Sequence, residues 1–320
     1  MDFFPGPKAP IDHSLDIQLN VDGSAERLAQ LAYHWIDHLL TEVAGDARAQ
    51  LAGLPALPSA AMKALGVGDL FGLVTVTRPN PAGGMAREKT RTLSVKGLQW
   101  LRSELADTPP NWVRLETGRI DEFGGLVGGD FSASIQTYDE SPGWMQLQAA
   151  VRASRFTDPA QGSQAQRRWL DAVRAYAEHA NPGFGQVGYH YYAGKTVLEQ
   201  HTDHRVAGLR RVEPRYAIGS CRDWLRGYSW LTLVPGDLTE KVGGSGGLGA
   251  TGAFVEVAQL GDGGMWLLAT NDFRDYLPEK AAEVFHALAP ILPPGMPVQA
   301  APSLVAPPAL LVYEDPSVSR

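Results

Sequence analysis

The sequence has a single cysteine, Cys221, and no long hydrophobic run. A lone cysteine cannot form an intramolecular disulfide, and such sparing use of cysteine is typical of proteins in a reducing cytoplasm. No apolar stretch reaches the roughly 20 residues that a membrane helix needs. The first residues, MDFFPGPKAPIDHSLD, also lack the basic and apolar segments of a signal peptide. We therefore expect a cytoplasmic protein without a membrane partner.

The sequence also has fewer basic than acidic residues. Lysine and arginine number 28 against 35 aspartate and glutamate residues, and the formal net charge is -7. The sequence holds no basic stripe with interleaved aromatics, and Arg210–Arg211 is only a short pair, so we expect no nucleic-acid partner. The same negative charge would attract a basic protein over a long range.

Complete catalytic motifs are missing as well. There is no G-x-S-x-G sequence, and Cys221 has a neighbouring arginine but no histidine that the sequence assigns to it. The glycines of GSGGLG, at 244, 246 and 249, match a dinucleotide fingerprint, which requires a strand before it and a helix after it. Here the expected order is reversed, so we interpret this stretch as a flexible loop.

Two histidine clusters are candidate metal sites. HTDHR contains His201, Asp203 and His204, and H-x-D begins the iron-binding triad of non-haem oxygenases. The alternative is a solvated polar loop. HWIDH places His34 and His38 one turn apart on a helix, a spacing able to bind zinc, but the sequence indicates no third ligand.

What the sequence does contain is a series of strand and helix patterns around a sizeable core, since 44% of its residues are hydrophobic. One helix begins after Ser24 and carries apolar residues at helical spacing. Further helices are predicted at 94–107, 165–180, 236–242 and 278–292. Strands are predicted at 15–21, 70–78, 185–192, 227–234 and 309–315, and β-hairpins at 129–151 and 252–270.

The two predicted hairpins resemble each other. Phe131 aligns with Phe254, and both are followed by a glutamine, an aspartate and a helix at similar spacing. Each half then runs strand–helix–hairpin–helix–strand, a βαββαβ order. We predict an α+β fold of two similar split βαβ-like halves, with mostly antiparallel sheets and helices on one face. Alternatively, the likeness is only that of any two hairpin–helix units.

The same patterns predict the domain organisation. Residues 1–69 would form an N-terminal strand, helix and linker, and residues 70–192 the first α+β half. Residues 193–226 would form a connector, and residues 227–320 the second half.

The stretch RGYSWLTLVPGDLTEKVGGSGGLGA, residues 226–250, resembles the C-terminal signature of the type VI secretion immunity-protein family. In that signature an aromatic strand leads into a short helix and a glycine-rich turn, represented here by Gly227, Trp230, Leu231 and Val234 and then by Val242, Gly243 and Gly244. The resemblance extends over roughly residues 70–292. The sequence departs from it at EPRYAIGSCRDWL, which keeps Arg215 and Tyr216, lacks the family's proline, and has its aspartate later, at Asp223.

The resemblance implies a bacterial, cytoplasmic antidote that binds and neutralises a cognate toxic effector, with no catalytic residues and no cofactor. Exposed aromatic side chains would then be candidate partner contacts, the alternative being that they pack in the core. The candidates are Trp112, Tyr138, Trp144, Tyr191 and Tyr192. Two other functions remain open: a metal-dependent enzyme using His201, Asp203 and His204, and an accessory component of a secretion assembly.

Overall fold

The computed structural model describes residues 11–80, 82–106, 108–202, 213–299 and 305–318. Its strands form one open ten-stranded sheet in the order β3-β2-β4-β5-β6-β1-β7-β8-β10-β9. The strands are β1 (Ser14–Asp22), β2 (Leu70–Arg78), β3 (Arg87–Thr92), β4 (Trp112–Ile120), β5 (Leu126–Thr137), β6 (Trp144–Arg152), β7 (Phe184–Tyr189), β8 (Leu231–Val234), β9 (Glu256–Gln259) and β10 (Met265–Leu268). All neighbouring strands in this order run antiparallel.

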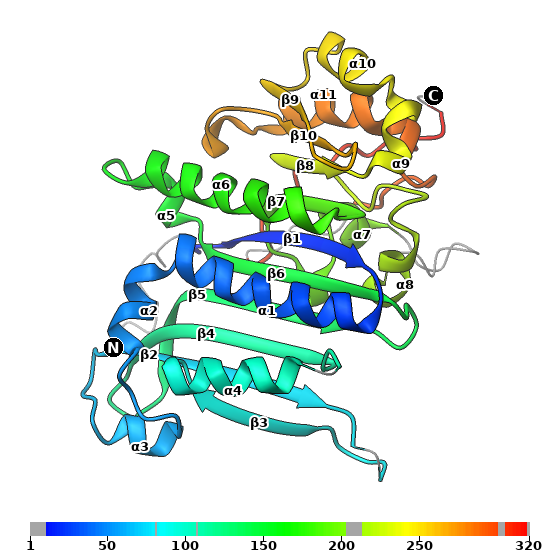
Figure 1. The fold of residues 1–320 in the computed structure, drawn as a ribbon. Coiled ribbons are helices and arrows are strands. Elements are labelled where there is room, and N and C mark those ends of the chain that lie inside the picture. Colours follow the sequence, from blue (N-terminus) through cyan, green and yellow to red (C-terminus); the bar gives the residue numbers. More distant parts are fainter. Residues whose placement is uncertain (1–10, 81, 107, 203–212, 300–304, 319–320) are drawn as a thin grey trace, which may run out of the picture.

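The helices connect and cover these strands. They are α1 (Ala25–Glu42), α2 (Gly45–Leu51), α3 (Pro58–Met62), α4 (Val95–Leu105), α5 (Ser154–Thr157), α6 (Gly162–Ala180), α7 (Val197–His201), α8 (Pro214–Ala217), α9 (Gly236–Thr239), α10 (Gly244–Ala250) and α11 (Pro278–Leu288). Figure 1 shows α1, α4 and α6 side by side on one face of the sheet. Within the described residues, no helix is both long and apolar enough to cross a membrane.

The N-terminal strand β1 lies in the middle of the sheet, between β6 and β7 (Figure 1). Its odd-numbered side chains from Leu15 to Val21 are fully buried and belong to the main core. The α1 helix packs on this core: Trp35 donates a hydrogen bond from its indole to the Gln148 carbonyl of β6, at 3.2 Å. Because β1 is central, its even-numbered polar side chains are buried too.

The predicted α+β class, with an antiparallel sheet, is confirmed. The segments 70–192 and 227–320 contribute their strands to the same continuous sheet. Strands β3 and β4 add to the elements expected from the sequence. The boundaries proposed for separate domains stay a prediction.

Two local expectations are wrong. GSGGLG forms helix α10, which begins after Gly243 in the left-handed region at φ +76° and buries Leu248 against the main core. The strand expected at 309–315 is an irregular segment. In it, the Val312 amide donates to the Tyr228 hydroxyl at 3.0 Å, where a strand would bond to a neighbouring backbone.

Candidate functional site

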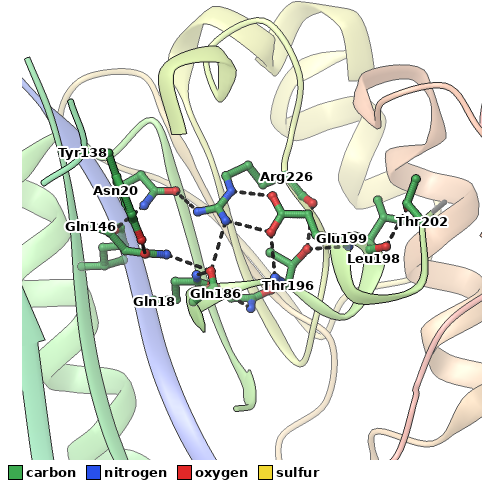
Figure 2. Close-up of polar contacts among 12 residues, drawn as sticks. Gln18, Asn20, Tyr138, Gln146, Gln186, Thr196, Leu198, Glu199, Thr202 and Arg226 are labelled. Carbon is green, nitrogen blue, oxygen red and sulfur yellow. Dashed lines mark hydrogen bonds and ion pairs between the residues drawn. The ribbon is translucent and has the colours of Figure 1, made fainter. Parts of the chain in front are cut away.

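A buried polar cluster lies where the even-numbered side chains of β1, β6 and β7 meet the segment that follows β7 (Figure 2). Strand alternation places Gln18 and Asn20 on this face, opposite the apolar side chains that contact the helices. Polar groups removed from water require hydrogen-bond partners. The members of the cluster therefore depend on one another for hydrogen bonds.

Arg226 and Glu199 form the centre of the cluster. The guanidinium donates to both carboxylate oxygens, at 2.7 and 2.8 Å, and both residues are almost fully buried, with exposures of 3% and 5%. A third bond runs from Nη1 to the Asn20 side-chain oxygen at 2.6 Å. Burial alone would lower the pKa of Arg226, but the Glu199 carboxylate outweighs it and holds the pKa above its usual value.

Glu199 is positioned by its own helix. The sequence T-V-L-E at 196–199 forms a capping box at the start of α7: the Glu199 amide donates to the Thr196 hydroxyl, and the Thr196 amide donates to the Glu199 carboxylate at 2.8 Å. The Thr196 hydroxyl in turn donates to the Arg226 carbonyl at 3.0 Å. This local motif thus holds the carboxylate in place for the distant guanidinium.

The backbone carbonyl of Gly194 is the shared acceptor of three further hydrogen bonds. It accepts hydrogen bonds from the side chains of Gln18, Gln146 and Arg226. Only glycine fits here, because φ is +71° and a Cβ would lie 2.5 Å from the Gln146 side-chain oxygen. Tyr138 completes the chain by donating to Gln146 at 2.8 Å, and burial raises the pKa of Tyr138 to about 12.

This arrangement is suited to holding the connector against the sheet. The charges of Arg226 and Glu199 neutralise each other, and the groups described here engage one another in hydrogen bonds. Cys221 lies nearby, fully buried, and burial raises the pKa of its thiol, so the reactive thiolate is disfavoured. The cluster therefore joins α7 and the segment before β8 to strands β1 and β6.

A second polar pair lies further along the same strands. The His190 ring shares a hydrogen bond with Asp16 across 3.0 Å between Nδ1 and Oδ2, and Asp16 is 2% exposed while the His190 side chain is 44% exposed. The other oxygen of Asp16 has no partner among the described residues. The hydrogen bond to Asp16 raises the pKa of His190 against the opposing effect of burial.

Replacing His190 with glutamine tests this pair through its pH dependence. Because the pKa of His190 is raised in the folded protein, its stabilisation is fully present below the unfolded value of about 6.5 and is lost as the pH rises through the raised value. We expect His190→Gln to lower the midpoint of urea unfolding more at about pH 5.5 than at about pH 8.5. The exposed His286 of α11 provides the control, His286→Gln. An equal loss at both pH values would contradict the assignment.

The five aromatic candidates occupy different environments. Tyr192 is 83% exposed, whereas Tyr191 is 6% exposed and donates from its hydroxyl to the Pro308 carbonyl at 2.9 Å. Trp112, Tyr138 and Trp144 are half-buried. Trp144 packs beneath the guanidinium of Arg222, whose carbon lies 5.8 Å from the ring centroid. Their role as partner contacts stays a prediction.

The predicted metal residues are only partly described. His201 ends α7, where its Nδ1 lies 3.0 Å from the Val197 carbonyl oxygen, whereas Asp203 and His204 lie outside the described residues. In the described part of the chain, no group of three or more histidine, cysteine, aspartate or glutamate residues is arranged to hold a metal ion. The metal hypothesis for this loop therefore stays a prediction.

The structure adds a third histidine to the pair on α1. His34 and His38 have ring centroids 5.7 Å apart, and His179 of α6 lies 6.4 Å from His34. The pKa of His34 is lowered by burial and by the two other rings. The i,i+4 spacing on α1 predicted that His34 and His38 lie together. His179 joins them because α6 packs on α1.

Several residues of the stretch 226–250, which carries the family resemblance, have structural contacts. Arg226 makes the buried ion pair, and a Cβ on Gly227 would lie 2.8 Å from Thr196 Cβ. Trp230 is fully buried and donates from its indole to the Thr270 carbonyl at 2.9 Å. Gly243 ends one helical segment and begins the next. These residues build β8, α9 and α10.

Comparison with known proteins returns a similar fold. No family model and no curated protein matches the chain. A solved structure of the Pseudomonas aeruginosa T6SS protein PA0821 superposes with a TM-score of 0.52 at 14% identity, covering 98% of this chain and 83% of that chain. At this level of identity, the likeness is one of fold.

Proposed function

We propose that this chain is an immunity-type protein that neutralises a cognate type VI secretion effector by protein–protein contact in the cytoplasm. The observation that supports this most is the likeness of nearly the whole fold to a T6SS protein. The resemblance of residues 226–250 to the immunity family points in the same direction and comes from the sequence alone. An accessory role in the secretion assembly is the nearest alternative.

The contact surface we propose is the solvated face of the sheet on strands β2, β3, β4 and β5. Cross-strand register places Thr77, Trp112 and Gln136 in one row on this face. The neighbouring row carries Arg114, which forms an ion pair with Glu116 at 2.6 Å. Val74, Val76, Val113 and Leu115 point the other way, into the main core beneath the helices. At the far end of the strands, Phe71 and Ile120 form a small separate cluster with Ala61 of α3.

Trp112 is the anchor we propose on this surface. Tryptophan is enriched among the residues that dominate binding free energy, because it buries a large area at small entropic cost. It is half-buried in the free chain, and its neighbours on the same face are polar groups able to form a hydrogen-bonded rim. The net charge of -7 would accelerate association with a basic effector.

The proposal is tested by co-expressing the chain with the toxin encoded beside its gene. We expect survival of the co-expressing cells and a complex of fixed stoichiometry in size-exclusion chromatography. Trp112→Ala should then weaken the affinity by about 30-fold, the size of a typical hot-spot loss of about 2 kcal/mol.

The matched control is Trp100→Ala, which removes a half-buried tryptophan from α4, on the opposite face of the sheet. Equal affinities for the two variants would reject the proposed surface while leaving the function intact. No protection and no complex with the neighbouring toxin would reject the function itself.

A further inference from the structure

A cavity of 310 Å³ opens beside the first turns of α6. It lies where the end of α1, the end of β6, the short helix α5 and the beginning of α6 come together (Figure 1). It is separate from the solvated sheet face and from the buried polar cluster, with which it shares no residue. Its volume is at the lower end of the range for small-molecule sites.

One part of the cavity wall is apolar and rigid. Val43, Val151, Phe156 and Trp169 line it, and the last two rings meet edge to face with centroids 6.2 Å apart. Trp169 is 1% exposed, and its indole N–H has no acceptor within the described residues. This part of the wall therefore suits an apolar group of a ligand.

The other part of the wall is polar and cationic. Arg155 and Arg168 both line the cavity, and Arg168 forms no ion pair with any described residue. Asp158 also lines the cavity, and its Oδ1 accepts hydrogen bonds from the amides of Ala160 and Gln161, each at 2.8 Å. The N-terminus of the 19-residue helix α6 adds a partial positive charge at the same place.

We propose that this cavity binds a small carboxylic acid with an apolar body. The carboxylate pairs with the guanidinium groups of Arg155 and Arg168, which suit two-oxygen acceptors, and the apolar body lies against the valine and aromatic wall. An apolar molecule without a charge would leave the arginines unused. Inorganic phosphate has no apolar part and would leave the apolar wall of the cavity without contacts.

Isothermal titration calorimetry with octanoate and octanamide tests the proposal on the full chain. The two compounds have nearly the same shape and differ in charge. We expect the acid to bind and the amide to bind at least about tenfold more weakly, since charge-assisted hydrogen bonds are about twice as strong as neutral ones. Equal binding of both compounds, or no heat with either at millimolar concentration, would overturn the proposal.

Variants at the cavity assign the binding to these residues. Arg168→Gln should weaken octanoate binding by at least about tenfold. Arg167→Gln removes the same charge from the adjacent exposed position, which does not line the cavity, and should leave the affinity unchanged. Ala165→Phe should fill the cavity and abolish binding. Equal affinities for the two arginine variants would refute the assignment, whether or not the phenylalanine variant folds.

Discussion

Arg226→Met is expected to destabilise the protein by about 3–5 kcal/mol, because it leaves the Glu199 carboxylate buried without its cation. That loss is a large share of the 5–15 kcal/mol by which domains are typically stable. The variant also loses the bonds from Arg226 to Asn20 and Gly194, which leaves Gln18 as the β1 side chain still bonded to Gly194. Urea unfolding monitored by tryptophan fluorescence measures the free energy of unfolding.

The double variant Arg226→Met/Glu199→Gln distinguishes the cost of an unpaired buried charge from the cost of altered packing. Removing both charges avoids the unpaired carboxylate, so the double variant should be more stable than Arg226→Met alone. Arg274→Met breaks an ion pair of the same 2.7 Å length, with Asp272, whose arginine is exposed to solvent, and should cost less than Arg226→Met. Wild-type stability of Arg226→Met would refute the structural role of the cluster.

Trp230→Ala is expected to cost about 3–5 kcal/mol, the usual range for removing a fully buried tryptophan. Its ring centroid lies 6.1 Å from Phe156 and 5.5 Å from Phe273, so it joins α5 to the segment that follows β10. The indole also satisfies the Thr270 carbonyl. The variant therefore loses both packing and a hydrogen bond, which thermal unfolding would report as a lower midpoint.

Trp230→Phe keeps most of the packing and removes the indole donor. Its expected loss is about 1–3 kcal/mol, since the buried Thr270 carbonyl is left unsatisfied. It also provides a measurement if the alanine variant does not fold. Trp100→Ala, at a half-buried position, should cost less than Trp230→Ala. The reverse order of these two losses would show that the contacts of Trp230 with Phe156 and Phe273 are not part of the central core.

Several elements were predictable from the sequence because their signals are local. The helix α1 begins where its cap predicted, with Ser24 accepting from the Arg27 amide at 3.3 Å. Its buried side chains, from Leu28 to Leu40, follow the helical period. The sequence of the central strand β1 alternates between apolar and polar residues, which predicted the strand but not the burial of its polar side chains.

The missed elements have weaker or conflicting local signals. Edge strand β3 has the sequence REKTRT, which is entirely polar and lacks the apolar alternation that predicts a strand. Strand β4 does alternate, with Val113 and Leu115 buried, so its signal was present. The glycines of α10 favoured a loop, whereas burial of Leu248 favours a helix. The contacts of Leu248 with the core therefore determine that this segment is helical.

The sequence by itself determined the α+β class, the main helices, the acidic charge and the amphipathic faces, because each depends on neighbouring residues. Only the tertiary structure decided that β1 occupies the centre of one continuous sheet, and that Asn20 meets Arg226 across 206 positions. Such contacts depend on which surfaces pack together, and neither spacing nor composition encodes that choice. The capping box at Thr196–Glu199 is local, whereas the arginine that pairs with its glutamate, Arg226, lies 27 positions further along the chain.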